Sequence, residues 1–315
     1  MHILIPSILP FLAAYFNLSG FKDPRSPSRF PGHVLTRLND GNELPSPFFG
    51  VGSVLKFQNV TDDVLMAFSN GYRTIDTASF YQTESSTGTA IAASGIPREN
   101  LYITTKFDAL YGQNVRHELD HSLKMLGVPY IDLYLIHFPQ LSTNLTDTWL
   151  QFEKLVDQGL VRSIGVSNFG VDDLNTILSV ARIKPTVNQI KYHAYNAANQ
   201  TALVKLCKEN DIVIEAYSSL TPLTTAPGGP AVSVAERIAK RLSKVTGADV
   251  TTGQVILTWL RTKGIVAVTT SSKDYRQREQ FAPFQDDFPL LTPQEIIDFE
   301  SFPGWNGTSF DGSLN

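Results

Sequence analysis

Three ionisable side chains of different types recur at a nearly constant spacing along the chain. Lys106 follows Asp76 by 30 residues and His137 follows Lys106 by 31, which matches one strand–helix unit of roughly 30 residues. Each of the three ends a short apolar or β-branched run, where a strand is expected to finish. A carboxylate, an ammonium and an imidazole at the ends of successive strands should converge. Groups that converge in this way shift one another's pKa and suit proton transfer.

Each of these residues also has an explanation without chemistry. A buried Asp76–Lys106 pair can be a satisfied ion pair, and a single histidine is more often structural than catalytic. However, an apolar run such as Leu133–Ile136 has no packing reason to end in an ionisable group. The three residues together therefore predict a catalytic site, with a purely structural ion pair as the alternative.

The elements that must position these residues repeat as strand, polar junction and helix from residue 34 onward. Strands that alternate with helices favour parallel pairing, and eight such units close into a (β/α)8 barrel with its chemistry at the C-terminal strand ends. An open, doubly wound sheet is the competing topology, but Gly50-Val51-Gly52 lacks the third glycine of a dinucleotide-binding turn. We predict an α/β fold: one TIM-barrel domain over residues 34–315 after an extension over residues 1–33. The predicted strands are Phe48–Val51, Tyr72–Asp76, Tyr102–Lys106, Ile131–His137, Val161–Ser167, Thr186–Gln189, Ile212–Ala216 and Ile265–Thr269.

Composition excludes several classes of partner and site. The 315 residues carry a net charge of −4 without a basic block, so a nucleic-acid partner is not expected. The single cysteine, Cys207, excludes an intramolecular disulfide and a cysteine-based metal site. The six histidines show no metal-ligand spacing at the strand ends, so no metal is expected and a metal-dependent barrel hydrolase is a disfavoured alternative.

The N-terminal segment Ile3–Phe16 is almost wholly apolar but is interrupted by two prolines. It is shorter than the roughly 20 residues that span a bilayer, and no Lys or Arg precedes Lys22 as a signal peptide would require. We therefore expect a cytoplasmic location and no membrane partner. Secretion is the alternative if residues 1–20 act as a signal peptide.

Longer motifs surround the ionisable residues and extend the pattern. They are Gly71–Ala78 followed by Tyr81 and Glu84, then Ile103–Lys106, Asp132–Pro139, Ile164–Phe169 and Pro185–Gln189. With these motifs the chain resembles the aldo-keto reductase family over about Leu38–Phe281. The resemblance implies a (β/α)8 barrel that reduces aldehydes or ketones with a nicotinamide cofactor.

The resemblance assigns Asp76, Tyr81, Lys106 and His137 as a catalytic tetrad with Tyr81 as the general acid. A carbonyl oxygen gains negative charge as hydride arrives, so it must receive a proton, and a tyrosine with its ordinary pKa near 10 is a sluggish donor at neutral pH. We expect Lys106, held by Asp76, to lower the pKa of Tyr81. His137 is expected to hydrogen-bond the carbonyl oxygen. Relatives with Glu at this position reduce carbon–carbon double bonds, so His137 favours carbonyl reduction.

The resemblance also implies where the cofactor binds. Polar residues at the strand ends would hold the carboxamide, an aromatic residue would stack on the nicotinamide ring, and the loops after the last two strands would hold the phosphates and adenine. The family's usual lysine beside the 2′-phosphate is replaced by Thr270, but the stretch around it is similar to that of fungal reductases that use NADPH. We expect NADPH, with NADH as the less favoured cofactor. The implied residues are Gly52, Ser53, Asp76, Ser167, Asn168, Gln189, Tyr217, Ser218, Leu220, Thr270, Ser271, Ser272, Lys273, Arg276, Glu279 and Gln280.

The substrate pocket is expected to be lined by Phe80, Tyr81, His137 and Phe138. Val54 and Phe138 stand where the family usually has tryptophan, so the pocket should differ in shape from that of most relatives. We expect a small carbonyl compound as the partner and a monomer or weak dimer. A regulatory barrel protein that binds the cofactor with little turnover is the alternative function.

Overall fold

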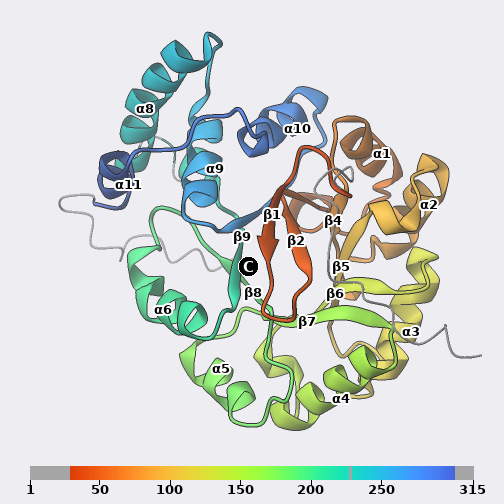
Figure 1. Cartoon of the computed structure of the whole chain (residues 1–315). Coiled ribbons are helices and arrows are strands. Elements are labelled where there is room, and N and C mark those ends of the chain that lie inside the picture. Colours follow the sequence, from red (N-terminus) through yellow and green to blue (C-terminus); the bar gives the residue numbers. More distant parts are fainter. Residues whose placement is uncertain (1–28, 226, 228, 302–315) are drawn as a thin grey trace, which may run out of the picture.

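Eight parallel strands form a closed barrel in the computed structural model, which describes residues 29–225, 227 and 229–301 (Figure 1). The strands pair in chain order, and β10 closes the ring by pairing with β3, where Val268 lies opposite Phe48. The predicted (β/α)8 barrel is therefore confirmed and the open-sheet alternative is wrong. The barrel strands are β3 (Phe48–Gly50), β4 (Thr74–Asp76), β5 (Tyr102–Phe107), β6 (Ile131–Ile136), β7 (Val161–Ser167), β8 (Val187–Lys191), β9 (Val213–Tyr217) and β10 (Val266–Thr269).

Helices surround the barrel and bury the outer face of its strands (Figure 1). Every residue of β5 and β6 is buried, which is why these strands read as continuous runs rather than alternating ones. On the outside of β6, Tyr134 stacks on Phe152 at 4.8 Å between ring centroids, and Trp149 stacks on Phe152 in turn. The helices are α1 (Thr61–Ser69), α2 (Glu84–Ser94), α3 (Val115–Leu126), α4 (Leu145–Asp157), α5 (Val171–Leu178), α6 (Thr201–Glu209), α7 (Thr221–Thr224), α8 (Pro230–Thr246), α9 (Thr252–Thr262), α10 (Asp274–Phe281) and α11 (Pro293–Glu300).

A β-hairpin covers the N-terminal end of the barrel, a feature that the repeat of strands and helices did not predict. It consists of β1 (Val34–Arg37) and β2 (Glu43–Ser46), which pair antiparallel. Its turn reaches the barrel through Asn39, whose amide donates to the Pro185 carbonyl at 2.9 Å. Beneath it lies a separate apolar cluster inside the barrel, which includes Leu44 and Leu133. The C-terminal strand ends, where barrel enzymes carry their sites, lie at the opposite end of the barrel.

The strands β4, β5 and β6 are staggered by two residues from one to the next. Asp76 pairs with Thr104, and Lys106, two residues further along, pairs with Leu135. The sequence interpretation that Asp76, Lys106 and His137 occupy equivalent places is therefore wrong in register. It still gave the correct face, because a shift of two residues returns a strand side chain to the same side of the sheet.

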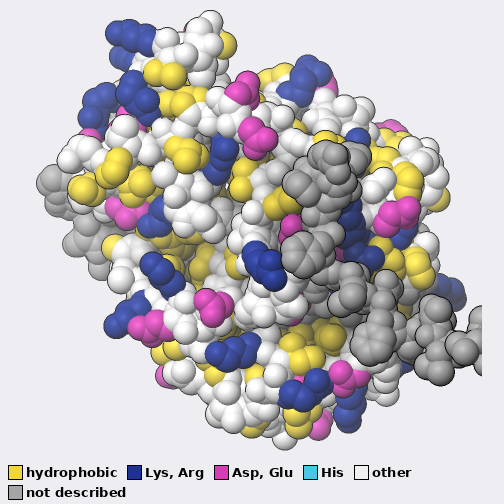
Figure 2. Space-filling view, viewed as in Figure 1, with side chains coloured by type: hydrophobic (Ala, Val, Ile, Leu, Met, Phe, Trp, Pro, Cys, Tyr) yellow, Lys and Arg dark blue, Asp and Glu magenta, His cyan; other side chains and the backbone are white. Residues whose placement is uncertain are grey.

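Two properties of the described residues concern the nucleic-acid and membrane partners considered above: the distribution of surface charge and the length and polarity of the helices. On the face viewed in Figure 1, Lys and Arg side chains lie scattered among Asp and Glu side chains (Figure 2). Within the described ranges, no helix is both long and apolar enough to cross a membrane. The predicted location concerns residues 1–20, and most of the predicted extension is residues 1–28. Both lie outside the described residues.

Candidate active site

Lys106 is the centre of the polar cluster at the C-terminal strand ends. It is fully buried at the end of β5, and its Nζ donates to both oxygens of Asp76 at 2.8 Å and to the Thr77 carbonyl at 2.9 Å. Burial alone lowers the pKa of Lys106, but the Asp76 carboxylate together with Tyr81 and Glu215 raises it above its ordinary value. Lys106 therefore stays a cation inside the barrel.

Tyr81 lies at the end of a short 3-10 helix, η2 (Ser79–Tyr81), in the loop after β4. Its hydroxyl is 3.5 Å from Lys106 Nζ and 3.4 Å from His137 Nε2. Burial raises the pKa of Tyr81 to about 12, although Lys106 acts in the opposite direction. We expected a net lowering, and the structure differs because burial of the phenol outweighs the nearby cation. Tyr81 therefore remains protonated, the form that a proton donor needs.

His137 follows β6 and completes the cluster. Its Nδ1 lies 2.5 Å from Oδ1 of Asp108, and its carbonyl accepts a hydrogen bond from Asn168 Nδ2 at 3.0 Å. Burial lowers the pKa of His137, while the hydrogen bond to Asp108 raises it. Sequence analysis did not identify Asp108, although it stands two residues after Lys106, just beyond the end of β5, and this even spacing was a usable signal.

The floor of the cluster holds two more residues. Gln189 of β8 donates to Oδ2 of Asp76 at 2.7 Å, so Asp76 is held from two strands. Glu215 of β9 is fully buried, and burial together with Asp76 raises its pKa to about 8. Asp76, which accepts directly from Lys106 Nζ with both oxygens, is the counterion of Lys106.

The predicted carboxamide positions form one connected polar wall across β7, β8 and β9. Ser167 Oγ donates to the Gln189 carbonyl at 2.9 Å, and Asn168 Nδ2 lies 3.1 Å from Ser167 Oγ. Tyr217 donates from its hydroxyl to Asn168 Oδ1 at 2.7 Å. Asn168 and Ser218 both adopt left-handed backbone conformations, with φ of 61° and 56°. The wall stands beside the tetrad, where a nicotinamide would have to lie.

The predicted residues for the phosphates and adenine cluster in the loop after β10 and on α10. Lys273 is the N-cap residue of α10, and Arg276 is on its first turn. Two buried polar atoms here, Thr270 Oγ1 and Gln280 Oε1, have no hydrogen-bond partner in the part of the chain that the structure describes. Unpaired buried polar atoms are costly, so these residues fit a nucleotide that would satisfy them.

The remaining predicted cofactor residues lie around this site in shorter loops. Gly52 precedes the 3-10 helix η1 (Ser53–Leu55), and a Cβ on Gly52 would lie 2.7 Å from the Tyr81 ring. Leu220 precedes α7. Glu279 accepts a hydrogen bond from Thr251 Oγ1 at 2.5 Å and pairs with Arg276 at 3.4 Å. Ser271 Oγ accepts from the Lys273 amide at 3.0 Å.

Exposed apolar side chains border the tetrad. Phe80 and Phe138 flank Tyr81 and His137 in sequence and are 46% and 41% exposed, unusually high for phenylalanine. The Phe80 ring contacts that of Phe57 at 5.8 Å, and the Phe138 ring stacks on His137 at 4.7 Å. Such a border suits the apolar part of a carbonyl compound.

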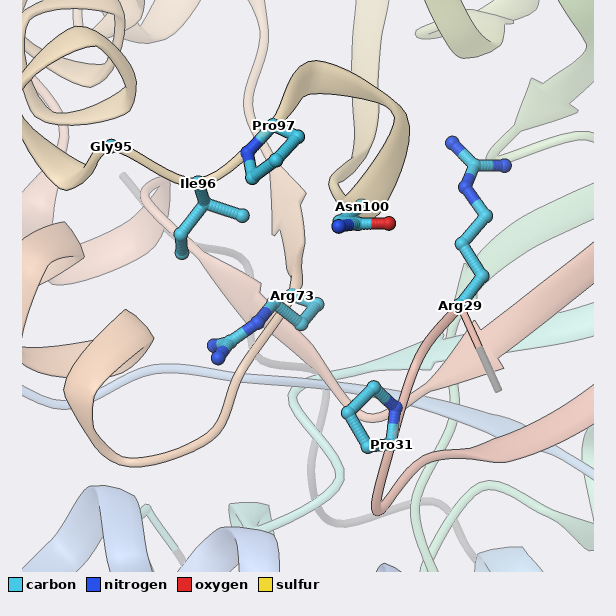
Figure 3. Close-up of a pocket in the computed structure, with 7 residues that line it drawn as sticks. All are labelled: Arg29, Pro31, Arg73, Gly95, Ile96, Pro97 and Asn100. Carbon is cyan, nitrogen blue, oxygen red and sulfur yellow. The ribbon is translucent and has the colours of Figure 1, made fainter. Parts of the chain in front are cut away.

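A hollow of about 390 Å³ lies away from this cluster (Figure 3). Its residues precede β4 and β5, so it belongs to the N-terminal end of the barrel, opposite the tetrad. Among the described residues, no group of three or more His, Cys, Asp or Glu side chains is placed to hold a metal ion. The hollow is lined by Arg29, Pro31, Arg73, Gly95, Ile96, Pro97 and Asn100.

A closed (β/α)8 barrel with a buried Asp–Lys pair, a phenol and an imidazole at its C-terminal strand ends defines a barrel-fold oxidoreductase. The chain belongs to the aldo/keto reductase family, whose model matches residues 48–285. The family assignment makes the protein a carbonyl reductase that uses a nicotinamide cofactor.

Characterised relatives cover most of the chain. It is 35% identical over 253 residues to the NAD/NADP-dependent indole-3-acetaldehyde reductase of Schizosaccharomyces pombe, covering 76% of this chain and 86% of that protein. It is 34% identical to the NADPH-dependent alpha-keto amide reductase of Saccharomyces cerevisiae, covering 82% and 87%. Among solved structures, the Bombyx mori aldo-keto reductase in complex with NADP matches with a TM-score of 0.74 and 32% identity, covering 85% of this chain and 92% of that one.

Proposed function

We propose that this chain reduces aldehydes or ketones to alcohols with NADPH and that Tyr81 is the general acid. The observation that carries the proposal is the position of the Tyr81 hydroxyl, 3.5 Å from the Lys106 ammonium and 3.4 Å from His137 Nε2. A carbonyl oxygen placed at this junction has a proton donor beside it. Bound NADPH would supply the hydride.

Each tetrad residue has a defined task in this proposal. Tyr81 gives its proton to the substrate oxygen as negative charge develops there. Lys106 then stabilises the resulting phenolate, because the ammonium is fixed beside the phenol before the reaction begins. Asp76 keeps Lys106 charged and oriented through two 2.8 Å contacts. His137 faces the same oxygen from the other side.

The choice of NADPH rests on the cations at the start of α10. Lys273 and Arg276 stand beside Ser271 and Ser272, so two positive charges and two hydroxyl donors are available for a 2′-phosphate. The similarity to a relative named as NADPH-dependent points the same way. An adenosine without the 2′-phosphate would make no use of these charges.

The border of Phe57, Phe80 and Phe138 supports an apolar substrate body attached to the carbonyl carbon. The test is NADPH oxidation by the purified full chain with a panel of aromatic and aliphatic aldehydes, diketones and keto esters. Turnover that is saturable and lost in Tyr81→Phe supports the proposal. Tight cofactor binding with no turnover on any member of the panel would instead support a regulatory barrel protein.

A further inference from the structure

We propose that Asp108 is a positioning residue that fixes the tautomer of His137 and so determines which proton His137 can offer to the substrate oxygen. The inference rests on the proposed carbonyl reduction but concerns a residue outside the tetrad. Asp108 follows β5 directly and is 6% exposed, beneath His137.

The contacts of Asp108 identify it as a hydrogen-bond acceptor. Its Oδ2 accepts from the Phe80 backbone N–H at 2.8 Å and lies 3.0 Å from Ser79 Oγ. The Phe80 N–H can only donate, so Oδ2 acts there as an acceptor. The other oxygen, Oδ1, faces His137 Nδ1 at 2.5 Å. An ionised carboxylate accepts only, so the proton between Asp108 and His137 belongs on Nδ1.

The opposite nitrogen of His137 is therefore a bare acceptor in the neutral ring. A neutral imidazole has one N–H and one lone pair, and with Nδ1 protonated the lone pair is on Nε2, 3.4 Å from the Tyr81 hydroxyl. In the substrate-free site Tyr81 donates to His137. A carbonyl oxygen also has only lone pairs, so neutral His137 cannot donate to it. Donation from His137 requires the doubly protonated imidazolium.

The groups around His137 determine the fraction of molecules in which its ring carries a second proton and is an imidazolium. Burial and the Lys106 ammonium lower the pKa of His137, and the Asp108 carboxylate raises it, with lowering as the net effect. Neutral pH therefore favours the neutral ring, and the imidazolium becomes more populated as the pH falls. The other titratable groups facing His137 or Asp108 are Asp76 of β4, Tyr81 of η2, Glu84 of α2 and Glu118 of α3.

The Asp108→Asn substitution should reverse the tautomer of His137. The amide oxygen can keep the acceptor role toward the Phe80 N–H, which places the NH2 group against His137 Nδ1. An NH2 group donates, so Nδ1 must carry the lone pair and the proton moves to Nε2. His137 in this variant can donate to the substrate oxygen while neutral, at any pH in the working range.

The tautomer can be read directly, without turnover. The full chain, saturated with NADP⁺, is labelled with ¹⁵N-histidine and studied by long-range ¹H–¹⁵N correlation at slightly alkaline pH, with His137→Gln identifying the signal. We expect protonated Nδ1 and bare Nε2 in the wild type, and the reverse in Asp108→Asn. A wild-type ring protonated on Nε2 alone overturns the proposal, even if the variant does not fold.

The pH dependence of kcat/KM is the second readout. Above the pKa of an essential imidazolium, kcat/KM should rise by up to about tenfold for each unit that the pH falls, and Asp108→Asn should flatten this slope.

Glu118→Gln, which keeps an acceptor for the Asp108 N–H at 2.7 Å, is the matched control and should retain the slope. The Asp108→Asn change should have no effect on slope in a His137→Asn background. A slope unchanged by Asp108→Asn alone overturns the proposal. Absence of turnover in the wild type would instead refute carbonyl reduction and leave the tautomer measurement intact.

Discussion

The aromatic ring of Tyr81 packs closely against Gly52. A methyl group added to Gly52 would lie 2.7 Å from Cε2 and 2.8 Å from Cζ of Tyr81, closer than non-bonded carbon atoms approach. The loop before η1 therefore fixes where the phenol can stand, and the glycine is required by this close approach.

Gly52→Ala should move the Tyr81 ring and lower kcat/KM by roughly 100-fold, since displacement of about 1 Å at a reacting group can cost that much. The measurement is steady-state NADPH oxidation with the best aldehyde of the panel. Gly170→Ala is the matched control, because its added Cβ would meet only Asp173 Oδ2 at 3.5 Å, an ordinary contact. Equal activity in the two variants would show that the contact does not position the phenol.

Tyr81→Phe removes only the transferable proton. Turnover should fall by about 10²- to 10⁴-fold, the usual contribution of a general acid, while the Kd for NADPH measured by fluorescence titration stays within a small factor of the wild type. Retained turnover would contradict the role of Tyr81. A large loss of cofactor affinity would show that the substitution had altered the site beyond the proton.

Asp76→Asn should destabilise the fold, because it leaves the fully buried Lys106 without its carboxylate. Breaking a buried ion pair on one side costs about 3–5 kcal/mol, which can be measured as the free energy of unfolding in denaturant. The double variant Asp76→Asn/Lys106→Met removes both charges and should recover most of this loss. A double variant that is less stable than Asp76→Asn would mean that Lys106 stabilises the barrel by other contacts.

Lys273→Ala/Arg276→Ala should weaken NADPH binding by roughly 10- to 100-fold, as expected for hydrogen bonds to a charged group, and leave NADH binding nearly unchanged. Titration of both cofactors measures the ratio. Arg278→Ala is the control, since Arg278 lies on the same helix but pairs with Asp274 at 2.5 Å. Equal losses for the two cofactors would place the 2′-phosphate elsewhere.

His33 should make stability depend on pH below neutrality. Burial lowers the pKa of His33 from 6.5 to about 4. Its Nε2 accepts a hydrogen bond from the backbone N–H of Arg73 at 3.3 Å. As the pH falls, His33 is therefore protonated in the unfolded chain before it is protonated in the folded one. The free energy of folding that neutral His33 contributes is fully present above pH 6.5 and is lost as the pH falls toward 4. At about pH 5 the loss should be about 2 kcal/mol. Unfolding free energies of wild type and His33→Gln at about pH 7 and 5 test this, and parallel curves would contradict it.

The sequence was sufficient to predict the barrel and the meeting of Asp76 with Lys106, because both depend on local patterns, whereas Tyr81 was placed by the family resemblance. Each of the eight predicted strands overlaps an observed one, and a repeat of one strand–helix unit places residues about 30 apart on neighbouring strands. The face on which a residue lies follows from its parity along the strand, so Asp76 and Lys106 met despite the two-residue stagger.

What the sequence did not predict depends on contacts between distant segments. Asp108 has a role only because the loop after β6 brings His137 over it, and no motif links the two. The raised pKa of Tyr81 follows from burial by the surrounding loops, whereas the motif shows only the nearby cation. The β1–β2 hairpin went unpredicted because its two strands pair with each other and lie outside the repeat.

The hairpin distinguishes the two ends of the barrel, and this matters when the protein is attached to a solid support. Since β1 and β2 cover one end, and the segment from Arg29 to Pro31 lies at that same end, the chain enters the described domain on the side away from the Tyr81 hydroxyl. An enzyme immobilised on a support through residues just ahead of β1 would face the bulk solution with its catalytic side, and reagents would reach the phenol without passing the support.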